Sequence, residues 1–586
     1  MTGILDSRHI RVNAAPPGRL QMPTAAKTLL TELETLKNSF GADLGAQKLE
    51  LLRRLESASL PTAETVLRLH EMLCFCGAHP DDARLLGQVE TMLASFHNRR
   101  DLQRQRSGLV DTGIEGTEIR YEFFMQMAQW LAKRWPDRLQ IDWAELGSGE
   151  KLDKILHLLA LYTETPGLDE FAFPVRDWIN RMKAPDETDA AFVINRIKDL
   201  ELDTPTREFF YERLDLPLVI AGGAGGPNRT RAKLSGTKVF YQTEPLQVKR
   251  PDLRVALKNP PLSVRAVNER KGQEIIDLAR EAMVTRSRDL DVFAYGDPRD
   301  VRLIDCGKGL QFAAIGALPE RRLIFEAVYG FLILKNGVPA GYVLNSALFG
   351  SVEVAYNVFE TYRGCEAAFM YGRLLAALKL VFAADTFTIY PYQLGGDGNQ
   401  EGLASGAWWF YQKLGFRARD EDVLKLMRSE LRRLRKTPKN RSSIATLEKL
   451  AAENVYFDVK KPRADVIGML PLANVGLHVT AYLADRFGAR RKQAEEVCAR
   501  EAMALLGVRS RQRWSAGEKL AWRRWSPLVL TLPGVAGWTA AEKKALVAVV
   551  RAKGGRRESD FTRLFDGHRK LRRVVKKLAM KDLSGA

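Results

Sequence analysis

The chain has 586 residues, with 90 Lys and Arg against 71 Asp and Glu, which gives a formal net charge of +19. This length predicts three or four domains, at about 100 to 200 residues per domain. Five scattered cysteines are typical of a reducing compartment. The first residues lack the apolar run of a signal peptide and no 18-residue apolar segment follows, so we expect a soluble, cytoplasmic protein.

Residues 24–215 carry a helical pattern. Leucines recur at three- and four-residue spacing, as at Leu29, Leu33 and Leu36, and proline, glycine and aspartate separate the segments. The pattern predicts a domain of helical hairpins without a fixed repeat. Such a domain more often presents a binding surface or packs on its neighbour than performs chemistry.

Cys74, Cys76 and His79, with His70 one helical turn before Cys74, form a local group of residue types that bind zinc. Their Cys-x-Cys-x-x-His spacing lacks the usual C-x-x-C pair. Cysteines on an apolar helix are usually core residues. We therefore expect no metal site.

Residues 216–261 are rich in glycine and proline and predict a linker between domains. An apolar run leads into a glycine loop at 222–226, which is followed by Arg229, Arg231 and Lys233. Glycine amides can approach an anion closely, so a phosphate-binding loop is the alternative interpretation. The spacing matches neither common phosphate-loop motif, which favours the linker.

Residues 262–420 alternate between the two periodicities of strands and helices. A first strand is expected at 262–267 and a first helix at 272–284, and Asn336-Gly337 is the strongest hairpin signal in the chain. Residues 352–359 alternate in the manner of a strand with different faces, which turns Glu353 away from the valines. The order predicts a mixed α/β domain.

A turn at 361–366 joins the 352–359 strand to a helix whose periodicity begins at Ala367. The first amides of a helix have no intrahelical partner, which makes them a site for phosphate, and Arg363 adds a positive charge. Another strand is expected at 387–392, followed by a helix with Trp408 and Trp409.

Two motifs in this region resemble those of the GNAT (N-acetyltransferase) superfamily. Residues 363–368 fill the six places of its pyrophosphate loop, which is Arg or Gln, then x-x-G-x, then Gly or Ala. Residues 407–416, AWWFYQKLGF, resemble its A-x-x-(F/L)-Y-x-K-x-G-F ending. The resemblance covers about 262–420, roughly a third of the chain, and implies a GNAT-like acyltransferase domain.

The resemblance implies an acyl-CoA donor, with acetyl-CoA expected, and an unknown amine as acceptor. It places the catalytic base at Glu353 and the acid that protonates the leaving thiolate at Tyr411. General acid–base help of this kind contributes about 10² to 10⁴ in rate. The donor-binding residues that it implies are Asn357, Val358, Phe359, Arg363, Gly364, Cys365, Glu366, Ala367 and Ala368.

The chain departs from the family's pattern at two places. Glu366 replaces the loop glycine, and Ala404 replaces an asparagine seven residues before the tyrosine. A carboxylate near a phosphate repels it. Glu366 must therefore point away from the phosphate, which leaves an enzyme, or occupy the anion site, which gives a catalytically inactive scaffold or binding protein. A different acyl donor, such as a charged tRNA, is a third alternative.

Residues 421–586 predict a basic helical domain. The last 106 residues contain 25 Lys or Arg against 10 Asp or Glu, and the end of the chain includes RKLRRVVKK at 569–577. A charge of this size over 481–586 is compatible with RNA or a ribosomal partner, and a solvated helical face is the alternative. Trp514, Trp522 and Trp525 lie among arginines, but their spacing favours helix packing over base stacking.

Overall fold

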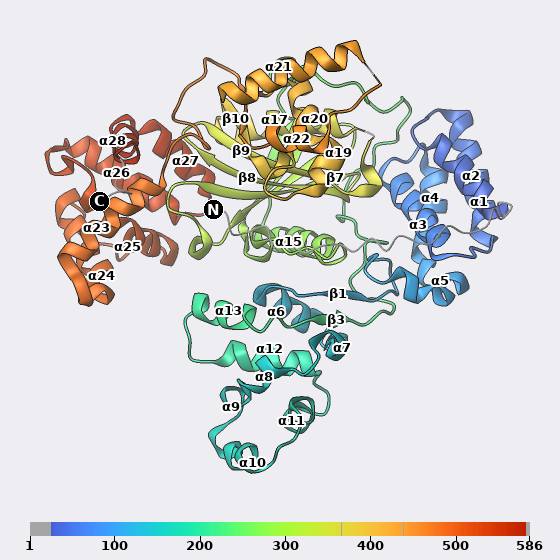
Figure 1. The fold of residues 1–586 in the computed structure, drawn as a ribbon, viewed down its shortest axis with the longest axis horizontal. Helices are drawn as coiled ribbons and strands as arrows, with labels where there is room; N and C mark the ends of the chain where they lie inside the picture. Colours follow the sequence, from blue (N-terminus) through green and yellow to red (C-terminus); the bar gives the residue numbers. More distant parts are fainter. Residues whose placement is uncertain (1–24, 365, 438, 582–586) are drawn as a thin grey trace.

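A computed structural model describes residues 25–364, 366–437 and 439–581 of the chain. The described residues form a mixed α/β protein with a three-stranded and a nine-stranded sheet. Figure 1 shows the large sheet between helices from the N-terminal part of the chain, in blue on the right, and helices from the C-terminal part, in orange and red on the left. A smaller unit projects below. None of the described helices combines the length and the apolar character that crossing a membrane requires.

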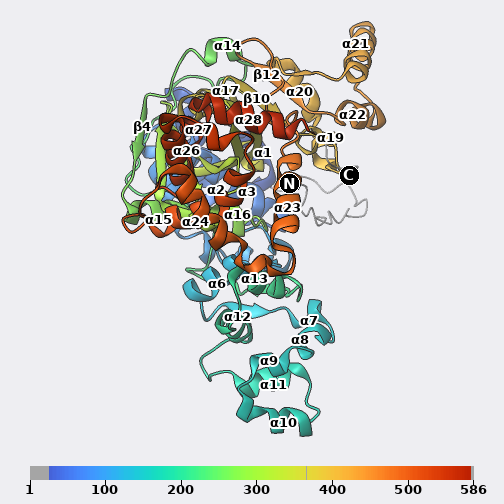
Figure 2. The same cartoon turned by 90° about the vertical axis from the view of Figure 1, so that its left-hand side faces the viewer.

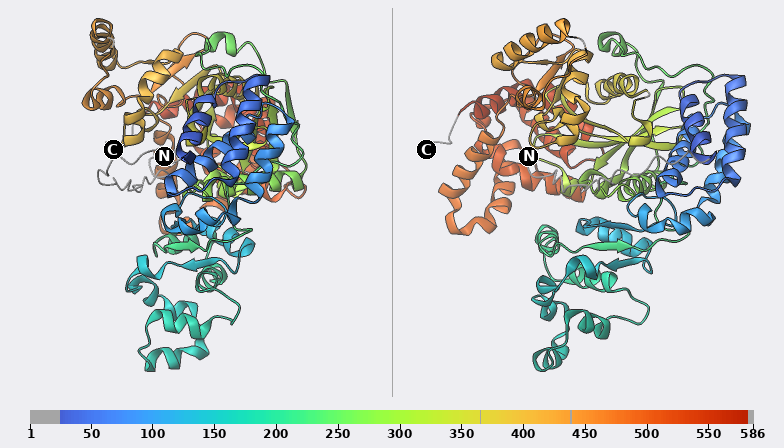
Figure 3. Two further views of the ribbon diagram at one scale, coloured as in Figure 1. Left: turned by 90° about the vertical axis from the view of Figure 1, so that its right-hand side faces the viewer. Right: turned by 45° about the vertical axis from the view of Figure 1, so that its right-hand side comes forward.

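The N-terminal helices pack around a leucine-rich core of their own, as the sequence predicts for this part of the chain. Thr62 begins the third helix with a reciprocal capping box to Thr65, and Asp82 caps the fourth. Figure 3 shows these helices standing against one end of the large sheet. They are α1 (Ala25–Leu36), α2 (Ala42–Ser57), α3 (Ala63–Ala78), α4 (Ala83–Ala94) and α5 (Arg100–Arg104).

The unit that follows is not purely helical, in contrast to the helical domain expected at 24–215. Three short strands form an antiparallel sheet in the order β1-β3-β2, and one of them, β3, comes from the expected linker. Each strand has only three residues, too few to show alternation in the sequence. The unit contains β1 (Ile119–Tyr121), α6 (Met125–Arg134), β2 (Leu139–Ile141), α7 (Trp143–Leu146), α8 (Glu150–Asp153), α9 (Leu156–Leu159), α10 (Thr165–Glu170), α11 (Val175–Met182), α12 (Asp189–Asp199), α13 (Thr204–Glu212) and β3 (Leu218–Ile220).

Residues 221–261 run largely without regular structure but are packed against the protein, which differs from the linker that the composition indicates. Leu234, Leu246 and Leu253 are buried in the central core. A short helix, α14 (Leu253–Ala256), lies near the end of the segment. Glycine and proline here allow an extended path over the surface while the leucines fix it there.

The nine-stranded sheet has the order β11-β12-β10-β9-β8-β7-β6-β5-β4. Its pairs are antiparallel except β9 with β10, which are parallel and joined through α17. In Figure 1, α15 lies below the sheet and α17 and α20 lie above it. The strands are β4 (Ser263–Ala266), β5 (Gly296–Asp305), β6 (Leu310–Ala317), β7 (Ala327–Lys335), β8 (Val338–Leu348), β9 (Ser351–Val358), β10 (Thr386–Ile389), β11 (Arg417–Ala418) and β12 (Val455–Asp458).

The hairpin predicted at Asn336-Gly337 is confirmed. It joins β7 to β8 with Lys335 opposite Val338, and both turn residues have positive φ. Asparagine and glycine tolerate this conformation better than other residues. The side chain of Asn336 donates to the carbonyls of Ala78 and Phe240, which anchors the hairpin tip to the end of α3.

The sheet extends past residue 420, where the sequence places the end of the central domain. Strand β12 inserts between β10 and β11 and pairs with both in antiparallel register. Its four residues follow two helices and gave no recognisable strand pattern. The remaining helices of the central part are α15 (Glu269–Val284), α16 (Asp291–Ala294), α17 (Ala367–Phe382), α18 (Pro391–Leu394), α19 (Gln400–Ser405), α20 (Ala407–Leu414), α21 (Glu421–Lys436) and α22 (Ile444–Leu450).

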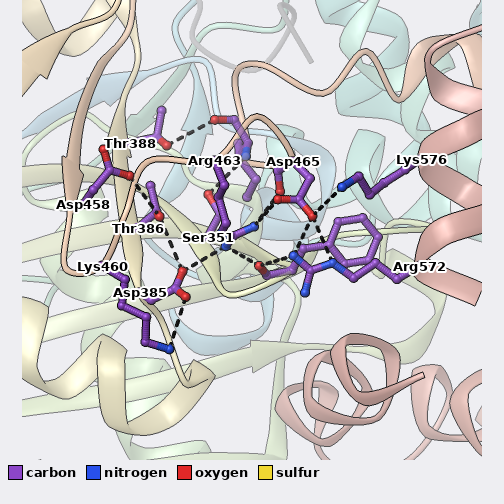
Figure 4. Close-up of polar contacts among 12 residues, drawn as sticks. Ser351, Asp385, Thr386, Thr388, Asp458, Lys460, Arg463, Asp465, Arg572 and Lys576 are labelled. Atoms are coloured by element: carbon purple, nitrogen blue, oxygen red, sulfur yellow. Dashed lines mark hydrogen bonds and ion pairs between the residues drawn. The ribbon is translucent and has the colours of Figure 1, made fainter. Parts of the chain in front are cut away.

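The C-terminal helices surround a core with buried Trp522 and Trp525, so these tryptophans pack between helices, as their spacing favours. Figure 2 is viewed from the side of these helices. Asp465 anchors the last helix, because it pairs with Arg572 and Lys576 of α28 and with Arg463, as Figure 4 shows. The helices are α23 (Ala473–Phe487), α24 (Ala494–Leu506), α25 (Ala516–Thr531), α26 (Ala540–Lys553), α27 (Glu558–Gly567) and α28 (Arg569–Ala579).

Candidate functional site

Strands β9 and β10 diverge immediately beyond Glu353. Their pairing comprises Ser351 with Thr386, Val352 with Phe387, and Glu353 with Thr388. β9 then continues to Val358 in contact with β8 alone, while β10 ends at Ile389. We call Val354–Val358 the diverging edge. At about 3.3 Å per residue it is roughly 16 Å long.

Some peptide groups of the diverging edge point away from β8, toward the side on which the pairing with β10 has ended. The N–H of Phe359 donates to the carbonyl of Ala340 on β8. Successive residues of a strand direct their backbone groups to opposite neighbours, so Val354, Tyr356 and Val358 face the β10 side. The carbonyl of Val358 accepts a hydrogen bond from Arg363 Nε at 3.0 Å.

The turn after β9 leads into the first amides of α17. The helix hydrogen bonds begin with Met370 N–H donating to the carbonyl of Glu366. The amides of Ala367, Ala368 and Phe369 therefore have no acceptor within the helix, and these residues are partly exposed. Cys365 lies outside the described residues.

Arg363 and Gly364 are exposed on the outer side of the turn. Arg363 Nη2 pairs with Glu401 of α19 at 2.6 Å, and both side chains are substantially exposed. Exposed ion pairs contribute only about 0 to 1 kcal/mol, so another anion can displace Glu401 from Arg363. Gly364 has a φ of 77°, the region that favours glycine, and a Cβ there would meet no neighbouring atom.

Glu366 points away from the outer side of the turn, into the protein. One carboxylate oxygen lies 2.8 Å from Lys335 Nζ and 3.5 Å from His79 Nε2, and all three side chains are buried. Burial alone would raise the pKa of Glu366, but hydrogen bonding to His79 and the charge of Lys335 lower it to about 2. No side-chain cap bond joins Glu366 to the start of α17. The carboxylate is therefore ionised and neutralised inside the protein.

The inner side of the turn rests on α3 and on the N-terminal helices. Thr361 Oγ1 donates to Glu71, and the Thr361 carbonyl accepts from Lys37 Nζ at 2.9 Å. Tyr362 is buried, with its hydroxyl 3.4 Å from the Cys74 carbonyl. The N-terminal helices thus fix the turn from one side and leave the Arg363 side open to solvent.

Glu353 lies on the face of the sheet opposite to α17. Its register partners are Ser346 on β8 and Thr388 on β10. Burial and the nearby charge of Glu326 raise the pKa of Glu353 to about 7. The structure therefore brings a second carboxylate, that of Glu326, close to Glu353.

Tyr411 is not next to Glu353. Its ring packs at 5.6 Å from Tyr371 of α17, and Tyr371 packs at 5.1 Å from Tyr356 of β9. Tyr356 and Glu353 are three residues apart in one strand, so they occupy opposite faces. Tyr411 is 4% exposed, and burial raises its pKa above the ordinary value. It belongs to the α17 face, across the sheet from Glu353.

The three donor-binding residues expected at the end of β9 are divided between the two faces. Asn357 lies on the Glu353 face opposite Tyr342, and its buried Oδ1 has no hydrogen-bond partner in the described part of the chain. Val358 is buried on the α17 face. Phe359 lies beneath Arg286, whose guanidinium is 3.6 Å from the ring centroid.

The basic residues of the loop at 229–233 form ion pairs with carboxylates. Arg229 pairs with Glu71, Arg231 with Glu115, and Lys233 with Glu90. Glu115 also accepts from the Gly225 amide. The glycine and basic residues therefore attach the segment to α3, to α4 and to the loop before β1 that holds Glu115, which gives no support to the alternative of a phosphate-binding loop.

The cysteine and histidine group of α3 is part of the packed interior. Burial raises the pKa of Cys74 to about 12 and that of Cys76 to about 11. His70 hydrogen-bonds to Thr230 at 2.9 Å. Over the ranges that the structure describes, no group of three or more His, Cys, Asp or Glu is arranged to hold a metal ion.

Sequence reasoning missed the partners of the site residues. The site residues have partners elsewhere in the chain: Glu366 contacts Lys335, Arg363 contacts Glu401, and Glu353 lies near Tyr390. A single Lys or Glu in the sequence does not indicate which residue it will pair with. Tyr390 follows β10, and burial together with the charges of Glu353 and Glu326 raises its pKa. It therefore lies close to both carboxylates.

The chain matches no family model, and no curated protein or solved structure is significantly similar to it.

Proposed function

We propose that this protein is a CoA-dependent N-acyltransferase that transfers an acyl group, with acetyl expected, to an unidentified amine. The observation that carries the proposal is that the pairing of β9 with β10 ends at Glu353, with the partly exposed start of α17 beyond the turn at the other end of the diverging edge. The resemblance of residues 363–368 and 407–416 to the GNAT motifs supports the same activity.

The donor's phosphates are assigned to the amides of Ala367, Ala368 and Phe369 together with Arg363. A helix start and a guanidinium both favour a negative charge. Each hydrogen bond to a charged group contributes about 1.5 to 3 kcal/mol. The peptide groups of Val354 and Tyr356 would bind the amide-bearing arm of the donor along the diverging edge, as a strand binds an added strand.

The position of Glu366 removes the objection that its charge raises against a phosphate site. Its carboxylate is bound to Lys335 and His79 inside the protein, and the charge of Lys335 compensates its own. The residue that stands where the motif has glycine therefore acts as an anchor of the turn. Glycine there would remove this anchor without opening a cleft.

Glu353 is assigned as the general base and Tyr411 as the general acid. They lie on opposite faces of the sheet, so the thioester would have to lie between them where β9 is no longer paired with β10. Glu353 takes a proton from the acceptor amine while the nitrogen forms a bond to the acyl carbon and the carbon–sulfur bond breaks. The thiolate leaves on the α17 face and takes a proton from Tyr411. A base with a pKa of about 7 is effective near neutral pH, and burial keeps the Tyr411 phenol protonated at that pH.

The experiment compares thermal unfolding of the full chain with and without acetyl-CoA, for the wild type, Arg363→Gln and Glu353→Gln. At 100 times the Kd, a ligand that binds only the folded protein stabilises it by about 2.7 kcal/mol. We expect a clear shift for the wild type and Glu353→Gln and a smaller one for Arg363→Gln. Release of free CoA in the presence of an amine mixture should be lost in Glu353→Gln. If acetyl-CoA did not change the unfolding temperature of the wild type, the alternative of a catalytically inactive scaffold would be favoured.

A further inference from the structure

The last helix carries a row of exposed cations on its outer side. Arg569, Arg573 and Lys577 are spaced four residues apart along α28, and Lys581 continues the row just past the helix end. All four are exposed, and none has an ion-pair partner among the described residues. We call these four residues the basic row. Like charges at this spacing repel each other and destabilise a helix, so the basic row lowers the stability of α28 when no anion is bound.

The other faces of α28 pack against the protein or form ion pairs with it. Leu571, Val575 and Leu578 are buried in the core of the C-terminal helices. The other cations are bound: Arg572 and Lys576 to Asp465, as Figure 4 shows, and Lys570 to Glu542. These contacts fix the rotation of the helix, so the basic row faces solvent. Figure 2 shows α28 on the side turned toward the viewer.

We propose that the basic row binds the phosphate backbone of a nucleic-acid duplex. From Arg569 to Lys581 there are 12 residue steps, or about 18 Å at 1.5 Å per residue, which corresponds to about five base-pair steps of one strand. Successive cations are about 6 Å apart along the helix axis and turn about 40° around it, so the row winds along the outer side of α28 and can follow the curved line of phosphates of one strand. The C-terminal helices, which carry most of the net charge of the chain, supply a positive field around it.

Two other anionic partners fit the row less well. An amphipathic helix binds a membrane by inserting its apolar face, but the apolar face of α28 is buried in the protein. Single strands are held largely by base stacking on exposed aromatic rings. Trp522, Trp525 and Trp538 of this region are buried, and the half-buried Trp514 packs on Trp522 and lies beneath the guanidinium of Arg551. Helix α28 itself has no aromatic residue, so it offers contacts to phosphates and no ring on which a base could stack. A duplex bound without sequence preference is the expected partner.

This inference rests on the C-terminal helices and not on the proposed acyltransferase activity. It is tested with the full chain by fluorescence anisotropy of a 20-base-pair duplex DNA over a series of salt concentrations. The variant replaces the row by glutamine: R569Q, R573Q, K577Q and K581Q. The matched control removes the same charge from exposed cations of the N-terminal helices: K27Q, R53Q, R54Q and R84Q.

Four phosphate contacts give a slope of log K against log salt of about −3.6. We expect the row variant to lose about 3 to 4 units of slope and to bind at least tenfold more weakly at low salt, while the control keeps the wild-type slope. The single variant Arg573→Glu tests the row with one change should the fourfold variant unfold, and it should weaken binding several-fold.

The proposal is overturned if the wild type does not bind the duplex at micromolar concentration, or if the control loses as much slope as the row variant. Tighter binding to a single strand of the same length would assign the surface to unpaired bases. Equal binding to poly-glutamate, or binding only to vesicles with anionic lipid, would assign it to an acidic protein or to a membrane.

Discussion

Glu366 and Lys335 form a buried ion pair, with Lys335 Nζ 2.8 Å from a carboxylate oxygen of Glu366. Lys335 ends β7 at the hairpin, and Glu366 precedes α17. The pair therefore joins the hairpin to the turn beside the proposed phosphate site. The residue that departs from the loop motif holds the turn in place from the inside.

Removing either member of this pair should destabilise the protein strongly. Lys335→Met leaves Glu366 as a buried charge with only His79 beside it, and Glu366→Gln leaves Lys335 unpaired. Breaking a buried pair in this way costs about 3 to 5 kcal/mol. Urea unfolding measures the loss. The control is Asp422→Asn, which breaks the exposed pair with Lys425 and should leave the free energy of unfolding nearly unchanged. Equal effects in the two pairs would contradict the burial of Glu366.

Glu353 should make the protein less stable as pH rises. Its pKa is raised to about 7 in the folded protein, against about 4.5 when it is unperturbed. A group with a raised pKa contributes stability below its unfolded pKa and loses it as pH rises through the folded one. The loss between pH 4.5 and 7 is at most about 3 kcal/mol. Glu353→Gln should remove this dependence in urea unfolding from pH 5 to 8, while an unchanged profile would show that Glu353 ionises normally.

Releasing Arg363 from Glu401 should improve donor binding. The carboxylate of Glu401 competes with the donor's phosphates for the same guanidinium. Glu401→Gln should therefore lower the Kd for acetyl-CoA about two- to fivefold, since an exposed ion pair is worth about 0 to 1 kcal/mol. Titration calorimetry measures the change. Glu421→Gln, an exposed glutamate at the start of α21, serves as the control and should leave the Kd unchanged. Weaker binding in Glu401→Gln would place Glu401 among the donor's ligands.

Asp465 should control the attachment of α28. Burial raises its pKa, but the hydrogen bonds of Arg463, Arg572 and Lys576 outweigh this and lower the pKa well below the ordinary range. A lowered pKa contributes stability above the unfolded value, about 3.9, and loses it as pH falls through the folded one. Asp465→Asn should therefore cost about 1 to 3 kcal/mol at pH 7, and the difference from the wild type should shrink only below about pH 4.

Limited proteolysis of residues 569–581 in Asp465→Asn provides the readout. Lys576→Gln is the matched control, because it leaves two cations on Asp465 and should accelerate cleavage less. If cleavage of the C-terminal helices is the same in both variants, the attachment does not depend on Asp465.

Local signals in the sequence predicted much of the site's framework. The period-two pattern of β9, the helical period of α17 and the Asn336-Gly337 turn each follow from a few neighbouring residues, and the structure confirms all three. These signals work because strand alternation, helix faces and positive φ are properties of short segments.

Features that depend on distant residues could not be predicted. The partner of Glu366 lies 31 residues earlier in the chain, and no spacing rule links the two. Strand β12 pairs with β10 although five helices and β11 lie between them in the chain, and β3 pairs with two strands from a region expected to be helical. The position of Tyr411 relative to Glu353 depends on which face of the sheet α20 covers, which is a matter of tertiary packing.

Hydrogen exchange of the full chain with and without acetyl-CoA tests the central claim most directly, because it reports on the backbone amides to which the donor is assigned. The account predicts slower exchange in peptides that cover the diverging edge, Val354–Val358, and the start of α17, Ala367–Phe369. Exchange in the N-terminal helices α1 and α2 should stay unchanged. The account would be contradicted if acetyl-CoA slowed exchange elsewhere but not at the start of α17, or if millimolar acetyl-CoA changed exchange nowhere.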